Sequence, residues 1–70
     1  MVEVFKTNVT STHQARQLVD LIEDYFDGYK VNFDLQDCDH ILRVEASREA
    51  VEPQPLISLL KDMGVRAEVL

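Results

Sequence analysis

The sequence contains few of the residues that cross-link or interrupt a chain. Its one cysteine, Cys38, excludes an intrachain disulfide, and two glycines and two prolines leave no glycine-rich phosphate loop or proline-rich linker. No apolar run approaches the roughly 20 residues of a membrane-spanning helix. Residues 1–6 lack the basic and apolar regions of a secretory signal. These absences predict a soluble, intracellular protein in a reducing, cytoplasmic setting.

Length and charge narrow the classes of function further. Seventy residues are enough for one domain, spanning residues 1–70. A domain of this size buries only about 60% of its unfolded surface, too little to enclose a deep substrate pocket. The chain is 46% hydrophobic and 29% charged, as expected of a folded protein, and its net charge is −6. An acidic surface disfavours nucleic acid and membranes as partners.

The periodicity of apolar residues predicts six elements in the order βαββαβ. Strands are predicted at 2–9, 29–35, 41–46 and 65–70, with helices at Thr12–Asp27 and Pro53–Met63. This order is typical of an α+β ferredoxin-like fold, a four-stranded antiparallel sheet with two helices on one face. In this topology the third strand lies between the first and second, and right-handed crossovers would bring three of the loops to one end of the sheet.

Side-chain alternation predicts which residues face the core. Val31, Phe33 and Leu35 share one face of their strand, and Leu42, Val44 and Ala46 share one face of the next. The first strand is ambiguous, because Val2 and Val4 point to one side and Phe5 to the other. The expected helical stripes are Ala15, Leu18, Val19, Ile22, Tyr25 and Phe26 in the first helix, and Leu56, Ile57, Leu59, Leu60 and Met63 in the second.

Several local patterns resemble the heavy-metal-associated domain, the fold of copper chaperones and of the N-terminal modules of metal-pumping ATPases. A Val9-Thr10 pair ends the first strand, Asn32-Phe33-Asp34-Leu35 forms an acidic strand, and residues 59–64 read Leu-Leu-Lys-Asp-Met-Gly. The resemblance runs from Val2 to about Leu70. It implies a ferredoxin-like fold and, in the family, a Met-Thr-Cys-x-x-Cys loop that binds metal.

The loop that would bind metal departs from the family pattern. Two thiolates at a helix N-terminus can hold Cu(I), but Ser11 and Gln14 stand at the two cysteine positions here. No metal is therefore expected at Ser11 and Gln14. Ser-x-x-Gln instead predicts a capping box worth about 1 kcal/mol. Val65, which follows the second-helix glycine, is a second departure from the family, where Lys or Tyr is common.

A displaced metal site is the alternative function. Cys38 and His40 are spaced as Cys-x-His at the predicted hairpin tip, within and just after the turn at 36–39, beside Asp37 and Asp39. The topology would bring His13 to within roughly 10 Å of this turn, since adjacent strands lie about 4.8 Å apart. Cys38, His40 and His13 could then hold a Cu or Zn ion. Against this, aspartates are ordinary turn formers and a lone cysteine commonly acts as a small buried hydrophobe.

Catalysis and RNA binding find no support in the sequence. It contains no Ser/His/Asp set, phosphate loop or distinct carboxylate pair. We therefore expect that the protein is not an enzyme and has no catalytic residues and no cofactor. Ile41, Arg43 and Glu45 occupy the strand where an RNA-recognition domain of this topology needs aromatic residues. A small-ligand-sensing regulatory domain of ferredoxin-like fold stays open as a minor alternative, because such sites form between paired subunits.

The remaining interpretation is a non-enzymatic binding, interaction or regulatory module. A sheet covered on one face leaves the other face and two edge strands open to a protein partner or to self-association. The expected interaction surface comprises Phe5 (if Val4 points inward), Ile41, Arg43, Glu45, Arg66 and Leu70.

Overall fold

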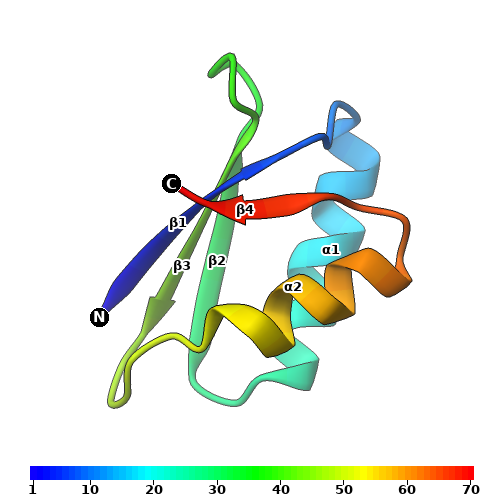
Figure 1. Ribbon diagram of the computed structural model, residues 1–70. Helices are drawn as coiled ribbons and strands as arrows, with labels where there is room; N and C mark the ends of the chain where they lie inside the picture. The colour runs from blue at the N-terminus through cyan, green and yellow to red at the C-terminus, as the bar shows by residue number, and fades with distance from the viewer.

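The computed structural model describes residues 1–70 and confirms the predicted fold. Its elements are β1 (Val2–Thr7), α1 (Thr12–Tyr25), β2 (Tyr29–Asp34), β3 (Ile41–Ala46), α2 (Pro53–Asp62) and β4 (Ala67–Val69). The four strands form one antiparallel sheet in the order β2-β3-β1-β4. Both helices cover the same face of this sheet (Figure 1). Neither helix is long and apolar enough to cross a membrane.

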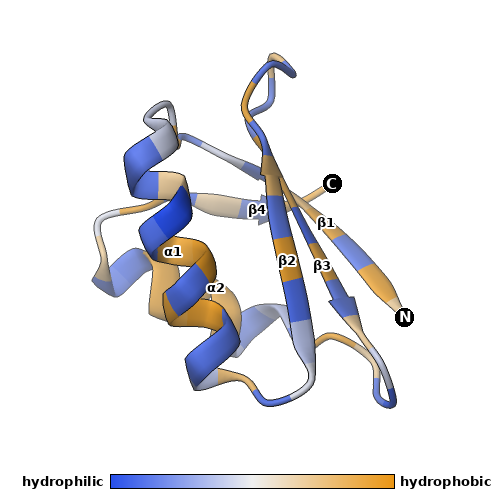
Figure 2. Cartoon of the chain, turned by 180° about the vertical axis from the view of Figure 1, so that it is seen from behind, coloured by the Kyte–Doolittle hydropathy of each residue, from blue (hydrophilic) through white to orange (hydrophobic).

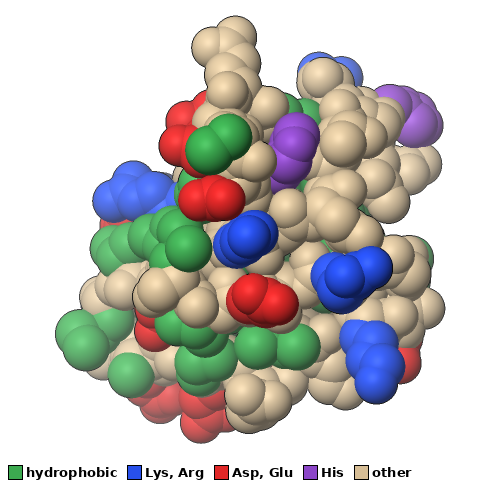
Figure 3. Space-filling view, turned by 45° about the horizontal axis from the view of Figure 1, so that its top comes forward, with side chains coloured by type: hydrophobic (Ala, Val, Ile, Leu, Met, Phe, Trp, Pro, Cys, Tyr) green, Lys and Arg blue, Asp and Glu red, His purple; other side chains and the backbone are tan.

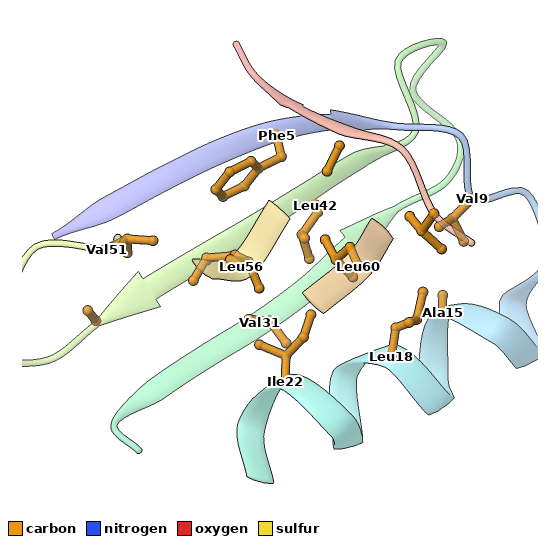
Figure 4. Packing of buried hydrophobic residues seen from close by; sticks show 14 residues of the cluster. Phe5, Val9, Ala15, Leu18, Ile22, Val31, Leu42, Val51, Leu56 and Leu60 are labelled. Carbon is orange, nitrogen blue, oxygen red and sulfur yellow. The ribbon is translucent and has the colours of Figure 1, made fainter. Parts of the chain in front are cut away.

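The register of β1 settles which of its side chains face the helices. Phe5 lies opposite Leu42 of β3, and Val4 lies opposite Arg43. Phe5 is fully buried, so its expected place on the uncovered face is wrong. Figure 4 shows its ring pointing from β1 into the space between sheet and helices. The reason is phase: Phe5 alternates with buried Thr7 and Val9, whereas Val2 and Val4 fall on the other side.

One core joins the sheet to both helices. Figure 4 shows Ile22 of α1, Leu56 and Leu60 of α2, and Leu42 of β3 converging in it, and all four are fully buried. Figure 2 shows orange, apolar segments on the helix sides that face the sheet and blue segments outside. Burying each such side chain contributes about 1.5–3 kcal/mol, which explains why two short amphipathic helices are held in place.

The start of α1 forms half of the predicted capping box. The Ser11 hydroxyl accepts a hydrogen bond from the Gln14 N–H at 3.2 Å. The Gln14 side chain, however, makes no return bond to the Ser11 N–H, so the second half of the box is absent. Ser11 alone caps the helix.

Both helices end slightly earlier than the apolar stripes predicted. In α1, the last helical residue Tyr25 is 68% exposed, and its ring packs in a T-shaped arrangement against Phe26, whose ring stacks on Tyr29. In α2, Met63 follows the last helical residue and is exposed. The first and last strands are also shorter than predicted. At their ends the Asn8 Oδ1 accepts the Arg66 N–H at 2.9 Å, which links the loops that precede α1 and β4.

Candidate functional site: the open sheet face, the hairpin tip and the β2 edge

The face of the sheet away from the helices, called here the open face, carries an apolar patch at one end. Val4 lies opposite Arg43 on β3, and on its other side the Leu70 N–H donates to the Val4 carbonyl at 3.0 Å. Val2 is two residues along the same strand, opposite Glu45. Leu70 is 63% exposed and Val2 48%. Val2, Val4 and Leu70 are therefore neighbours on one face, and we call them the apolar patch.

Charged residues surround this patch in complementary pairs. Lys30 of β2 faces Glu45 of β3, and Lys6 of β1 faces Glu68 of β4. Directly opposed side chains on a sheet have Cβ atoms about 5 Å apart, close enough for such charges to attract. Ile41 is half-buried on the same face. Figure 3 shows apolar side chains gathered on one side of the molecule with acidic and basic groups beside them. The open face thus has an apolar end within a mixed-charge surface.

The open face matches most of the surface predicted from the sequence. Ile41, Arg43, Glu45 and Leu70 lie on it. Arg66 is exposed just before β4. Phe5 is the exception, and Val2 and Val4 take its place. The alternation of Phe5, Thr7 and Val9 is the signal that could have assigned this strand correctly.

The hairpin tip between β2 and β3 is anchored to the end of β1. Within the tip, the Asp37 carboxylate accepts the Asp39 N–H at 2.9 Å, and the Asp37 carbonyl accepts the His40 N–H at 3.0 Å. The Thr7 hydroxyl donates to the His40 carbonyl at 2.6 Å, and the Thr7 N–H donates to the Asp39 carbonyl at 3.1 Å. His40 has a φ of 47°, the left-handed region that L-residues rarely adopt. These contacts hold its backbone in that conformation.

Of the three metal ligands predicted from the sequence, Cys38, His40 and His13, only Cys38 belongs to the group of potential ligands in the structure. Ligand atoms of Asp37, Cys38 and Asp39 lie within 4.8 Å of one another, and neither His13 nor His40 belongs to this group. Figure 3 shows the two histidine side chains as separate patches. Cys38 is exposed, not the buried hydrophobe that a lone cysteine often is, while the Nδ1 of His40 is buried without a hydrogen-bond partner. The group combines one soft sulfur ligand with two hard carboxylate ligands.

A groove between α1 and the edge strand β2 was missed by sequence reasoning. It measures about 450 Å³ and is lined by Thr12, Ala15, Arg16 and Val19 of α1 and by Val31, Asn32, Phe33 and Leu35 of β2 and the turn after it. Beside it, the Glu23 carboxylate of α1 accepts the Val31 N–H at 3.1 Å. No pattern in the sequence indicates this contact, because it depends on how closely the helix approaches the strand edge.

Comparison with known proteins adds no family assignment. No family model matches the chain, and no curated protein matches its sequence significantly.

Proposed function

We propose that this chain is a small non-enzymatic interaction module that binds a protein partner through its open face. The observation that carries this proposal is the apolar patch of Val2, Val4 and Leu70 on a sheet face that no helix covers. Protein interfaces commonly combine an apolar centre with a polar rim. Here Arg43 and Glu45 lie directly opposite patch residues and supply that rim.

The charge of the chain indicates the kind of partner. A net charge of −6 attracts a basic protein surface and accelerates its association. The patch has few residues, which favours a weak or transient complex over a permanent one. We further propose a cytoplasmic setting, based on the single cysteine and the absence of a disulfide.

A relationship to heavy-metal-associated domains is part of the proposal. Support comes from the βαββαβ order and from Ser11, which caps α1 at a position where that family has a metal-binding cysteine. A hydroxyl that accepts a helix N–H stabilises the helix but offers a soft metal no thiolate. In this interpretation the domain keeps the fold of the heavy-metal-associated domains and has lost their metal-binding cysteines.

The test compares partner capture by wild-type protein with capture by two lysine variants. Leu70→Lys places a charge in the apolar patch, while Tyr25→Lys changes an equally exposed apolar residue on α1. We expect a partner cross-linked from the native cell to be lost with Leu70→Lys and retained with Tyr25→Lys. Equal retention by both variants would contradict the proposal.

A displaced metal site is the second candidate, favoured by the grouping of Asp37, Cys38 and Asp39. If the chain carries Cu or Zn there, isothermal titration under reducing conditions should give submicromolar affinity that Cys38→Ser abolishes. That affinity would fall as the pH is lowered, because the Cys38 thiol must lose its proton to bind the metal. On the interaction proposal, binding is weak and Cys38→Ser leaves it unchanged. His13→Ala and His40→Ala test whether either histidine contributes.

A further inference from the structure

The outer edge of β2 has backbone groups that no neighbouring strand uses. β2 is the first strand of the sheet order and pairs only with β3. Its Val31 N–H points outward to Glu23, so the backbone groups of Tyr29 and Phe33 point the same way by alternation. The Tyr29 N–H is used by the Phe26 carbonyl at 3.3 Å. Val31 and Phe33 are therefore the central positions at which another strand could pair.

We propose that a second copy of this chain pairs with β2 along this edge, antiparallel and centred on Asn32. In this register Lys30 of each copy lies opposite Asp34 of the other, and Val31 lies opposite Phe33. Opposite charges directly across strands stabilise pairing, whereas like charges oppose it. Lys30 and Asp34 are both exposed, and although one Asp34 oxygen accepts the Gln36 N–H at 3.2 Å, its other oxygen can meet Lys30 of a second copy.

The neighbouring registers do not offer this complementarity. Centring the pair on Lys30 or on Asp34 places two like charges face to face. Centring it on Val31 or Phe33 places Asn32 opposite Lys30 or Asp34, so that no opposite charges meet. Strand edges that carry charged residues usually resist pairing. This edge is self-complementary in one register only, and that register is centred on Asn32.

The groove beside β2 fits the same occupant. In the Asn32-centred register, Phe33 and Val31 of the second copy lie beside Val31 and Phe33 of the first, on the helix-facing side. That side opens into the groove of about 450 Å³, whose α1 wall includes Ala15 and Val19. The two-fold axis would run perpendicular to the sheet, so both copies' helices would lie on one side of a continuous sheet. Each copy would fill the groove of the other.

Glu23 controls access to this edge. Its carboxylate accepts the Val31 N–H, which in the dimer must donate to the Phe33 carbonyl of the second copy. Both cannot happen at once, so each copy gives up its Glu23 bond on pairing. The wild-type chain should therefore associate weakly, and removal of the Glu23 side chain should strengthen association.

Sedimentation equilibrium over micromolar to millimolar concentrations tests this inference. We expect Glu23→Ala to tighten dimerisation by at least about tenfold, because two competing bonds are removed per dimer. In the Glu23→Ala background, Lys30→Asp and Asp34→Lys should each abolish the dimer. An equimolar mixture of these two proteins should restore it, because each facing pair again joins opposite charges.

Control variants separate this edge from other surfaces. Lys61→Asp makes the same charge change as Lys30→Asp on an exposed residue of α2 and should leave the dimer intact. Leu70→Lys should also leave it intact, since the proposed partner surface lies on the open face. Circular dichroism checks that each variant is folded. A monomeric Glu23→Ala protein at millimolar concentration, an unrestored mixture, or dissociation by Leu70→Lys would each overturn the inference.

Discussion

Thr7 joins three parts of the molecule through one hydroxyl group. Its Oγ1 donates to the His40 carbonyl at 2.6 Å and accepts the Val9 N–H at 3.2 Å. Thr7 is the one buried polar residue, 6% exposed, at the end of β1. Its side chain therefore fixes the hairpin tip and the start of the loop to α1 at the same point.

Thr7→Val removes both of these bonds while keeping the shape of the side chain. A hydrogen bond contributes about 0.5–1.5 kcal/mol net, and a buried group left without a partner costs roughly 1–3 kcal/mol. The added methyl group returns at most about 0.8 kcal/mol. We expect a loss near 2 kcal/mol, a large part of the roughly 4–10 kcal/mol available to a domain of 70 residues. The melting temperature should fall by roughly 8–16 °C.

Urea denaturation followed by circular dichroism measures this loss, with Thr7→Ser as the matched control. Serine keeps the hydroxyl and removes one methyl group, so it should cost only about 1 kcal/mol. We expect Thr7→Val to be the less stable of the two variants. If Thr7→Val is as stable as Thr7→Ser, the hydrogen bonds of Thr7 are not what holds this region.

Three further pairs of substitutions test local features by the same measurement. Ser11→Ala should cost about 0.5–2 kcal/mol because it removes the cap of α1, whereas Gln14→Ala should cost little, since its side chain returns no bond; equal losses would contradict this. Phe5 is fully buried, so Phe5→Ala should lower the stability by about 3–5 kcal/mol, and Val4→Ala should lower it clearly less. A larger loss for Val4→Ala than for Phe5→Ala would show that β1 has the opposite phase. Gly64 has a φ of 79°, so Gly64→Ala should lower the stability by about 1 kcal/mol. Gly64→Asn should lower it less, because Asn tolerates the left-handed region. An unchanged denaturation midpoint for Gly64→Ala would argue against the left-handed conformation.

The fold was predictable because most elements have an unambiguous period. Val31, Phe33 and Leu35 alternate with polar residues, and Leu42, Val44 and Ala46 do the same, so their core face follows from the spacing alone. The order of elements then restricts the topology, and the predicted position of β3 between β1 and β2 is confirmed. The first strand was harder, since buried Thr7 is polar and exposed Val2 is apolar.

The candidate sites were only partly predictable, for a physical reason. Ile41, Arg43, Glu45 and Leu70 could be placed on the open face because strand alternation fixes their side. The contact between Glu23 and Val31 could not be predicted from the sequence. It joins a residue of α1 to the edge of β2, and no pattern in the sequence shows how closely these two elements approach. The Cys38 group also excludes His40, whose backbone has a φ of 47°, and the sequence pattern reveals neither fact.

The pairing of β1 with β4 brings residues from opposite ends of the sequence side by side. The Leu70 N–H bonds the Val4 carbonyl, and Phe5 lies opposite Val69. A short linker from residue 70 to residue 1 would therefore turn this long-range pair into a hairpin, with new termini opened at Cys38 in the exposed hairpin tip. Closing a short loop costs less chain entropy than closing one that spans the whole sequence. Such a circular permutant makes the β1–β4 pair local but separates β2 from β3, whose hairpin is cut at Cys38, so these two strand pairs exchange their local and long-range roles in folding.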